Sequence, residues 1–451
     1  PSEGSPAAEA GLQAGDIIME INGKDMAQGD RTPNELTSYV SDNLRGDPGT
    51  TCVLKLERPT ADSTYIPMEL KITRGTIRTN PVPYYGMVDK NIGYIAISTF
   101  AIEGCSKDIK KALIELKQQG ATSIVLDLRG NGGGLLSEAV NVVNFFVPKG
   151  KEIVVTKGKI KQAGSTYKTS NEPIDMEIPL TVLVDGATAS AAEIVSGSLQ
   201  DLDRAVIVGN RTYGKGLVQV PRELPYNSSM KVTTAKYYIP SGRCIQAIDY
   251  AKRNADGSVA RIPDSLTTVF HTAAGREVRD GGGIRPDVEV KAERFPNIMF
   301  YLLNDDMIFD YATQYCIKHP NIGEVKDFSV TDADYDDFKQ MLKKRNFTYD
   351  RQSEKSLKNL KEIAEFEGYM EGASEEFAAL EKKLTHNLDH ELNRFSKQIR
   401  KAIAEEIVKR HYFQRGVILE RMKDDADLTK AIETLKDKEG YTKILSVPAD
   451  K

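Results

Sequence analysis

Short apolar runs that alternate with polar residues fill the first part of the chain, between turns rich in Gly, Pro and Asp. DIIMEING, TTCVLKLER and YIPMELKITR have the period of half-buried strands, and ELTSYVSDNL has helical spacing. A connector with two prolines, NPVPYYG, follows them. The pattern predicts a small β-rich domain over residues 1–78.

From Gly93 the pattern changes to continuous apolar runs that alternate with helices. GYIAISTF, SIVLDLRG, IPLTVLVD and AVIVGN are typical of buried strands, and DIKKALIELKQQG and SAAEIVSGSLQD of helices between them. LVQV and MKVTTAKYYI add further strands, and the unit closes near RPDVEV. We expect an α/β domain with a buried sheet over residues 79–295.

The remainder, residues 296–451, is highly charged and predicted to be all-helical, so the whole chain is an α/β multidomain protein. Ser374, followed by two glutamates, is a plausible N-cap for one long helix over residues 377–407. That helix must bury its apolar stripe against other helices, the core or a second subunit. The stripe consists of Phe377, Leu380, Leu384, Leu388, Leu392, Phe395, Ile399, Ile403 and Ile407.

Composition excludes several function classes. Apolar residues make up 40% and charged residues 28% of the 451 residues, and the net charge is only -4, which implies neither a nucleic-acid partner nor a strongly acidic one. The four cysteines have no CxxC spacing, so we expect neither a zinc knuckle nor a dense disulfide framework. No run of about 18 apolar residues predicts a spanning helix.

The segment DGATASAAEIVSGSLQD supplies a candidate nucleophile, Ser190, between a predicted strand and a predicted helix. A hydroxyl at a helix start lies near free backbone N–H groups and the positive end of the helix dipole. The N–H of Ala191 would point toward an oxyanion formed beside Ser190. The simpler interpretation of Ser190 is an ordinary helix cap.

A general base is needed to activate this serine. His271 and the four histidines of the helical tail lack an orienting acid in a recognisable motif, so a Ser-His-Asp triad is disfavoured. Lys215, between two glycines, could act as the general base if burial lowers its pKa. Gln219, four residues further along, could orient the amine of Lys215. A solvated turn lysine is the alternative.

LDLRGNGGGLL places three glycines between a strand and a helix, a layout that presents backbone N–H groups to an anion. A phosphate site is the rival interpretation. Because neither the GxxxxGKS pattern nor the dinucleotide fingerprint is present, an oxyanion hole is the better hypothesis.

Six ordered motifs resemble the carboxyl-terminal processing proteases of serine peptidase family S41 over about residues 80–290: GYIAISTF, LDLRGNGGGLL, GATASAAEIVSGSLQD, GNRTYGKGLVQ, YYIPSGRCIQ and GIRPDVEV. The resemblance implies Ser190 as nucleophile, Lys215 as general base and Gln219 as the residue that orients the lysine. The oxyanion donors would be Ala191 N–H and one of Gly133 and Gly134. It also implies a β/α core similar to crotonase and the Clp peptidase, an extended substrate, and neither cofactor nor metal.

GSPAAEAGLQAGDIIMEINGKDM resembles the middle and later part of a PDZ domain, which in this family takes the free C-terminus of a protein substrate. The first strand and the carboxylate loop that should precede Pro1 are absent. We therefore expect the natural protein to extend upstream, where an export or membrane-associating segment would lie. By resemblance, the location is the bacterial periplasm or cell envelope.

Two regions depart from the simple family pattern. Residues 247–281 are an insertion, interpreted as a flap or an interface loop. In the tail, His386 and His390 have a spacing that zinc can use, but no third ligand is evident, so homo-oligomerisation or a helical lid is the better hypothesis.

Three other functions stay open. A peptide- or ligand-binding protein is possible because retinoid-binding proteins look related to this core without being proteases. A crotonase-type hydrolase would need His271, and the tail could serve as a scaffold. The joint presence of Ser190, Lys215 and Gln219 favours the protease.

Overall fold

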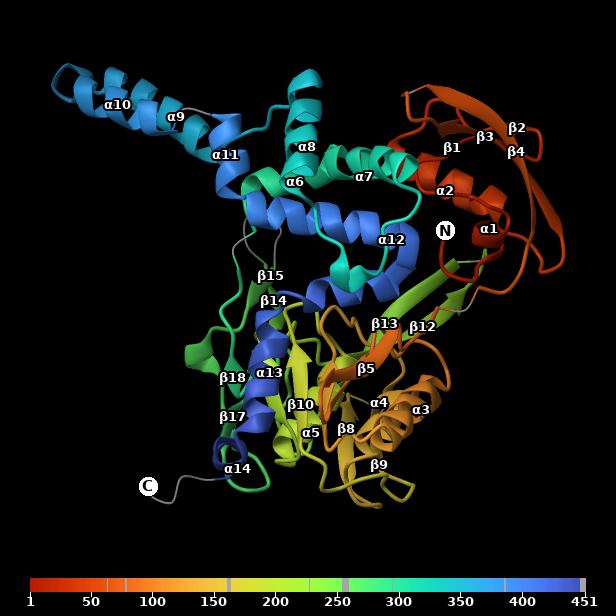
Figure 1. Cartoon of the computed structure of the whole chain (residues 1–451). Coiled ribbons are helices and arrows are strands. Elements are labelled where there is room, and N and C mark those ends of the chain that lie inside the picture. Colours follow the sequence, from red (N-terminus) through yellow and green to blue (C-terminus); the bar gives the residue numbers. More distant parts are fainter. Residues whose placement is uncertain are drawn as a thin grey trace. The chain divides into compact units, whose positions relative to one another are not determined.

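The computed structural model describes residues 1–62, 64–77, 79–159, 164–226, 228–253, 259–293, 295–384 and 387–446. The chain packs into two compact units, whose elements are labelled in Figure 1. The first unit contains residues 1–77 and 293–423, and the second contains residues 78–292 and 424–451. Packing therefore divides the predicted helical tail at residue 423 and assigns its end to the unit that holds the α/β core.

The start of the first unit is a four-stranded antiparallel sheet with two helices, in agreement with the predicted β-rich domain. Its strand order is β2-β1-β3-β4, and its core includes Ile21, Cys52 and Leu54. Thr32 and Glu35 form a capping box at the start of the longer helix. The elements are α1 (Pro6–Glu9), β1 (Ile17–Ile21), β2 (Lys24–Asp25), α2 (Pro33–Leu44), β3 (Thr51–Pro59) and β4 (Tyr65–Thr73).

Helices build the rest of the first unit, as the sequence predicts. Their shared core contains Phe338, Leu392, Ile399, Ile403 and Ile407. The elements are α6 (Asn297–Asn304), α7 (Met307–Lys318), η3 (Val325–Asp327), α8 (Asp332–Lys344), α9 (Gln352–Phe366), α10 (Met370–Leu384), α11 (Leu388–Arg394) and α12 (Ser396–Met422).

The prediction of one long helix over residues 377–407 is wrong. Three helices, α10, α11 and α12, cover this stretch, and the predicted cap Ser374 lies inside α10. Asn387 starts a new helix because its side chain accepts the N–H of His390 at 3.0 Å. Phe395, with φ of -105° and ψ of 19°, separates α11 from α12. Apolar periodicity continued across both breaks, so it could not reveal them.

The second unit is built on a six-stranded sheet with the order β18-β11-β10-β7-β6-β5. All neighbouring pairs are parallel except β5 and β6. Every residue of the four central strands is buried, which explains their continuous apolar sequences. The strands are β5 (Tyr84–Asp89), β6 (Ile92–Ala96), β7 (Ser123–Asp127), β10 (Leu180–Val184), β11 (Val206–Gly209) and β18 (Val288–Glu289).

Helices cover both faces of this sheet. On one face α3 (Cys105–Gln118), α4 (Leu136–Val143) and α5 (Ala191–Asp201) share a core with alternate strand residues such as Leu126 and Val182. The intervening residues point to the opposite face. There α13 (Ala426–Lys436) contacts β7, β10 and β11, and α14 (Lys438–Leu445) contacts β11 (Figure 1).

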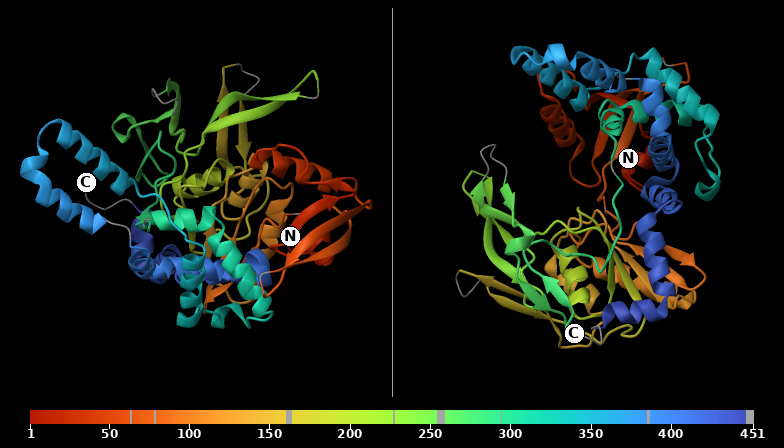
Figure 2. Two further views of the ribbon diagram at one scale, coloured as in Figure 1. Left: turned by 90° about the horizontal axis from the view of Figure 1, so that it is seen from above. Right: turned by 90° about the vertical axis from the view of Figure 1, so that its left-hand side faces the viewer.

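A second sheet of the same unit has the order β12-β13-β8-β9, and its β12–β13 hairpin extends away from the rest of the unit (Figure 2). The insertion over residues 247–281 forms two short hairpins, β14 with β15 and β16 with β17. None of the described helices is long and apolar enough to cross a membrane. The elements are β8 (Glu152–Gly158), β9 (Ser165–Lys168), β12 (Leu217–Leu224), β13 (Ser228–Tyr238), β14 (Ile248–Arg253), β15 (Val259–Arg261), η2 (Asp264–Leu266), β16 (Val269–His271) and β17 (Glu277–Arg279).

Candidate active site

Ser190 lies at the sharp turn between β10 and α5. Its φ of 57° and ψ of -118° are unfavourable for a residue with a Cβ, so the surrounding structure must hold the turn. All residues of α5 are buried, and this packing fixes the helix that follows the serine. The half-buried serine is therefore held in a fixed place directly before the N–H of Ala191, the first residue of the helix.

A pocket of about 380 Å³ opens at this turn. Its walls include apolar side chains such as Leu136, Ile194 and Val218. All the residues that the sequence predicts to act in chemistry line it: Ser190, Lys215, Gln219, Ala191, Gly133 and Gly134. The structure thus brings together segments that lie far apart in the sequence.

The carboxyl group of Glu193 joins the Ser190 turn to the Lys215 loop. Its Oε2 accepts the backbone N–H of Ser190 at 2.9 Å and that of Lys215 at 2.8 Å. Its Oε1 accepts the N–H of Gly214 at 2.8 Å and the hydroxyl of Thr212. Burial raises the pKa of Glu193, and these hydrogen bonds oppose that shift. One buried side chain therefore sets the positions of both the candidate nucleophile and the candidate base.

Lys215 is half-buried between two glycines that the packing requires. Gly214 has φ of +85°, and a Cβ there would lie 2.3 Å from the Cβ of Ala247. A Cβ on Gly216 would lie 2.8 Å from the backbone nitrogen of Gln246. The loop runs so close to the neighbouring segment that side chains larger than hydrogen do not fit, as the sequence predicts.

Gln219 lies near the start of β12 and lines the pocket together with Lys215, which precedes that strand. The pairing of β12 with β13 shifts register between Val218 and Gln219, and the extra residue, Thr234, lies on β13. Val218 and Gln219 both line the pocket, and Gln219 is exposed.

Tyr237, on β13, is a site residue that sequence reasoning missed. Its hydroxyl donates to the carbonyl oxygen of Lys215 and lies 3.3 Å from that of Ser190. Burial raises the pKa of Tyr237, so the phenol keeps its proton and can donate it. Strand patterning gave no signal for this role. Glu193 was missed as well, although the S-x-x-E capping pattern that begins at Ser190 was a signal that could have found it.

The glycine-rich loop packs directly against the Ser190 turn. Gly133 has φ of +94°, and a Cβ there would lie 2.8 Å from the Cβ of Ser190. A Cβ on Gly134, whose φ is +149°, would lie 2.1 Å from the nitrogen of Ala101. The N–H of Gly133 donates to Asn131 Oδ1 at 2.9 Å. Of the two predicted glycine donors, Gly133 is thus already engaged within the loop.

Within the described residues, no hydrogen bond joins Ser190 Oγ to Lys215 Nζ, although both residues line the same pocket. Catalytic hydrogen bonds are often long or misaligned before substrate binds, so the dyad remains a prediction. His271 is exposed on β16 and is not among the pocket residues. His386 lies outside the described residues, and among the described ones no group of three or more His, Cys, Asp or Glu could hold a metal ion.

Family models match three parts of the chain: peptidase family S41 over residues 91–252, a PDZ domain over 1–58, and the C-terminal helical domain of probable PDZ-proteases over 298–435. A carboxy-terminal-processing protease of Bartonella bacilliformis is 39% identical over 254 residues, or 55% of either chain. A carboxyl-terminal-processing protease of Picosynechococcus is 39% identical over 243 residues, 53% of this chain and 55% of its own.

The chain spans about half the length of these curated relatives. Among solved structures, a photosystem II D1 C-terminal processing protease shares 30% sequence identity. The match covers 66% of this chain and 68% of that one, with a TM-score of 0.36.

Proposed function

Because the chain belongs to peptidase family S41, we propose that it is a serine endopeptidase that removes C-terminal segments from proteins. One observation carries the proposal: a single pocket is lined by a serine on a strained turn, a lysine and a glycine-rich loop. A serine nucleophile, an amine base and backbone oxyanion donors are the groups that acyl transfer needs.

In the proposed reaction, Ser190 Oγ attacks the carbonyl carbon of the scissile peptide bond while the side-chain nitrogen of Lys215 takes the hydroxyl proton. The C=O electrons move onto oxygen, and N–H groups stabilise the resulting oxyanion. The lysine then gives the proton to the leaving amine as the C–N bond breaks. Water, deprotonated by the same amine, hydrolyses the acyl-enzyme and releases Ser190.

The oxyanion donors would be the N–H groups of Ala191 and Gly134. Ala191 is the first residue of α5, so its N–H has no partner within the helix. The hydrogen bond from Gly133 to Asn131 favours Gly134 as the second donor. Gln219, beside Lys215 in the pocket, would orient the amine.

Substrate recognition is proposed to involve the PDZ domain, which would bind the free C-terminal carboxylate of a protein substrate through backbone N–H groups. A role in the bacterial envelope is proposed by analogy with the processing proteases. Homo-oligomerisation through the helical domain and membrane association through an upstream segment stay predictions.

The first prediction concerns the dyad. Ser190→Ala and Lys215→Ala should each lower kcat by about 10³-fold or more, because neither leaves an activated nucleophile. Turnover is measured on an unfolded peptide with a free apolar C-terminus and on its amidated form, and circular dichroism checks that the variants fold. Faster cleavage of the free-carboxylate peptide would support tail recognition.

Parent-like turnover in Lys215→Ala would refute the lysine as base. A well-folded parent that binds the peptide but does not cleave it would favour the alternative, a non-catalytic peptide-binding protein on the same fold.

A further inference from the structure

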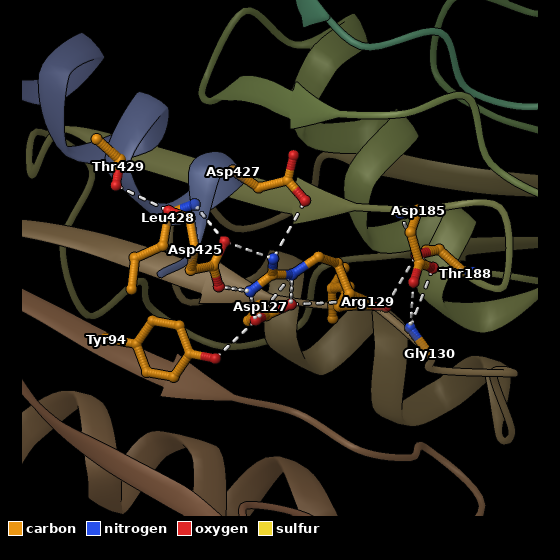
Figure 3. A network of polar contacts seen from close by, with 11 residues as sticks. Tyr94, Asp127, Arg129, Gly130, Asp185, Thr188, Asp425, Asp427, Leu428 and Thr429 are labelled. Atoms are coloured by element: carbon orange, nitrogen blue, oxygen red, sulfur yellow. Dashed lines mark hydrogen bonds and ion pairs between the residues drawn. The ribbon is translucent and has the colours of Figure 1, made fainter. Parts of the chain in front are cut away.

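Arg129, in the loop between β7 and α4, binds carboxylates from both chain segments that form the second unit (Figure 3). Its Nε donates to Asp127 Oδ1 at 3.0 Å, and its Nη2 donates to Asp127 Oδ2 at 2.6 Å. Its Nη1 and Nη2 donate to the two oxygens of Asp425, at 2.9 and 2.7 Å. Nη1 also donates to Asp427 at 3.1 Å. Within the described residues, the C-terminal segment supplies both partners of Nη1.

Asp425 is also held in place by the helix α13 that it caps. Its Oδ1 also accepts the N–H of Leu428 at 2.9 Å and so caps α13. The helix buries Leu428, Ala431 and Leu435, and this burial of apolar side chains holds it on the sheet. The carboxylate that meets Arg129 is therefore attached to a docked helix and not to a mobile tail.

The loop on the other side of Arg129 leads directly to the pocket. The next residue, Gly130, donates its N–H to Asp185 at 3.0 Å. Asn131 accepts the N–H of Ala189, the residue before Ser190, at 2.9 Å. Gly133 then packs against Ser190 itself. A displacement of Arg129 would thus move the glycine loop relative to the nucleophile.

The charges favour a paired arginine at this position. Burial lowers the pKa of Arg129, but the charges and hydrogen bonds of Asp127 and Asp425 outweigh it and raise the pKa overall. The Arg129 side chain is 21% exposed and that of Asp425 is 8% exposed, so solvent screens their bidentate contact only weakly.

We propose that Asp425 is a positioning residue of the peptidase, which holds the oxyanion loop in place through its bidentate contact with Arg129. Asp425 lies outside residues 91–252, the part of the chain that matches the peptidase family. The catalytic pocket would then depend on residues 424–451, which pack in the same unit as the peptidase core. This inference rests on the proposed function.

Asp425→Asn tests the contact without removing the cap, since asparagine caps helices as well as aspartate does. Asp437→Asn is the matched control, because Asp437 caps α14 through the N–H of Gly440 at 2.9 Å and lies in the same segment. We expect Asp425→Asn in the full chain to lower kcat about 10- to 100-fold with KM within about twofold, and Asp437→Asn to change neither.

Hydrogen exchange gives a second readout that does not need turnover. In Asp425→Asn the amides of residues 130–135 should exchange faster than in the parent, while those of α13 keep their protection. Unchanged exchange in the loop would overturn the proposal. Equal acceleration in the loop and in α13 would also overturn it, because Asp425 would then serve only to dock the helix.

These readouts separate the two proposals. A parent without peptidase activity would refute the proposed function, and exchange in residues 130–135 would still decide whether Asp425 holds the loop. An active parent with an equally active Asp425→Asn variant would refute the positioning role alone.

Discussion

Two walls of the pocket are built in different ways. The Ser190 turn is bonded by Glu193 and Tyr237, which both lie within residues 91–252. The glycine loop is tied through Arg129 to Asp425, 296 positions further along the chain. The Ser190 side is thus complete within residues 91–252, whereas the glycine-loop side also uses residues 424–451.

Because of this difference, substitutions are expected to affect the two walls in different ways. Four hydrogen bonds to one buried carboxylate join the Ser190 turn to the Lys215 loop, so a single change there disturbs several contacts at once. The loop has both a glycine backbone that fits closely and a side-chain link at Arg129. Its geometry can therefore be altered locally, at a glycine, or remotely, at the C-terminal segment.

The largest effect is expected at the Ser190 turn. Glu193→Gln replaces one carboxylate oxygen by an NH₂ group. This group then faces either the N–H groups of Ser190 and Lys215 or that of Gly214, so hydrogen bonds between the turn and the loop are lost. We expect kcat to fall by about 100-fold or more and the free energy of unfolding by about 1–3 kcal/mol. Peptide cleavage and denaturant unfolding measure the two quantities.

Glu138→Gln is the control for Glu193→Gln. Glu138 is also buried and accepts the N–H groups of Gly104 and Ser106, but it does not line the pocket. We expect a similar loss of stability with kcat retained. If both variants lose activity in proportion to stability, the special role of Glu193 is refuted.

A smaller effect is expected at the glycine loop. Gly133→Ala puts a Cβ 2.7 Å from the carbonyl oxygen of Ala189, so the Ser190 turn must shift and kcat should fall about 10- to 100-fold. Gly130→Ala, at φ of +71° with nothing within 4 Å of the added Cβ, should cost only about 1 kcal/mol of stability. Similar kinetics in the two variants would show that backbone strain, not the close contact, controls the loop.

The smallest effect is expected at Asp427. Burial raises the pKa of its carboxyl, so the folded chain binds this proton more tightly than the unfolded chain does. Its stabilising contribution is present at acidic pH and is lost as the pH rises through the raised pKa. Asp427→Asn removes that dependence, so its Tm relative to the parent should rise by a few degrees between about pH 4 and pH 7. A relative Tm that falls over this range would contradict the assignment.

Much of the fold could be predicted from periodicity. Continuous apolar runs gave the buried strands β6, β7, β10 and β11, and the strand-to-helix junctions gave Ser190 and the glycine loop. These features are local, since each depends on about ten neighbouring residues. The β-rich and helical regions were likewise recognisable from their patterns.

Other features depend on contacts that periodicity does not encode. Asn387 and Phe395 interrupt helices within an unbroken apolar stripe. The role of Tyr237 follows from where β13 passes the pocket, and that of Asp425 from the docking of α13 on the sheet. In the sequence, Asp425 has the pattern of an ordinary helix cap. Its contact with Arg129 becomes visible only in the folded structure.

The interleaving of the two units also sets an order of events during synthesis. Residues 78–292 leave the ribosome well before residues 424–451, yet α13 from that last segment covers the face of the sheet formed by β7, β10 and β11. Until it arrives, apolar residues of that face such as Leu183 and Val208 lack their cover and Arg129 lacks Asp425. The newly made chain therefore forms the contact between Arg129 and Asp425 only after residues 293–423 have been translated.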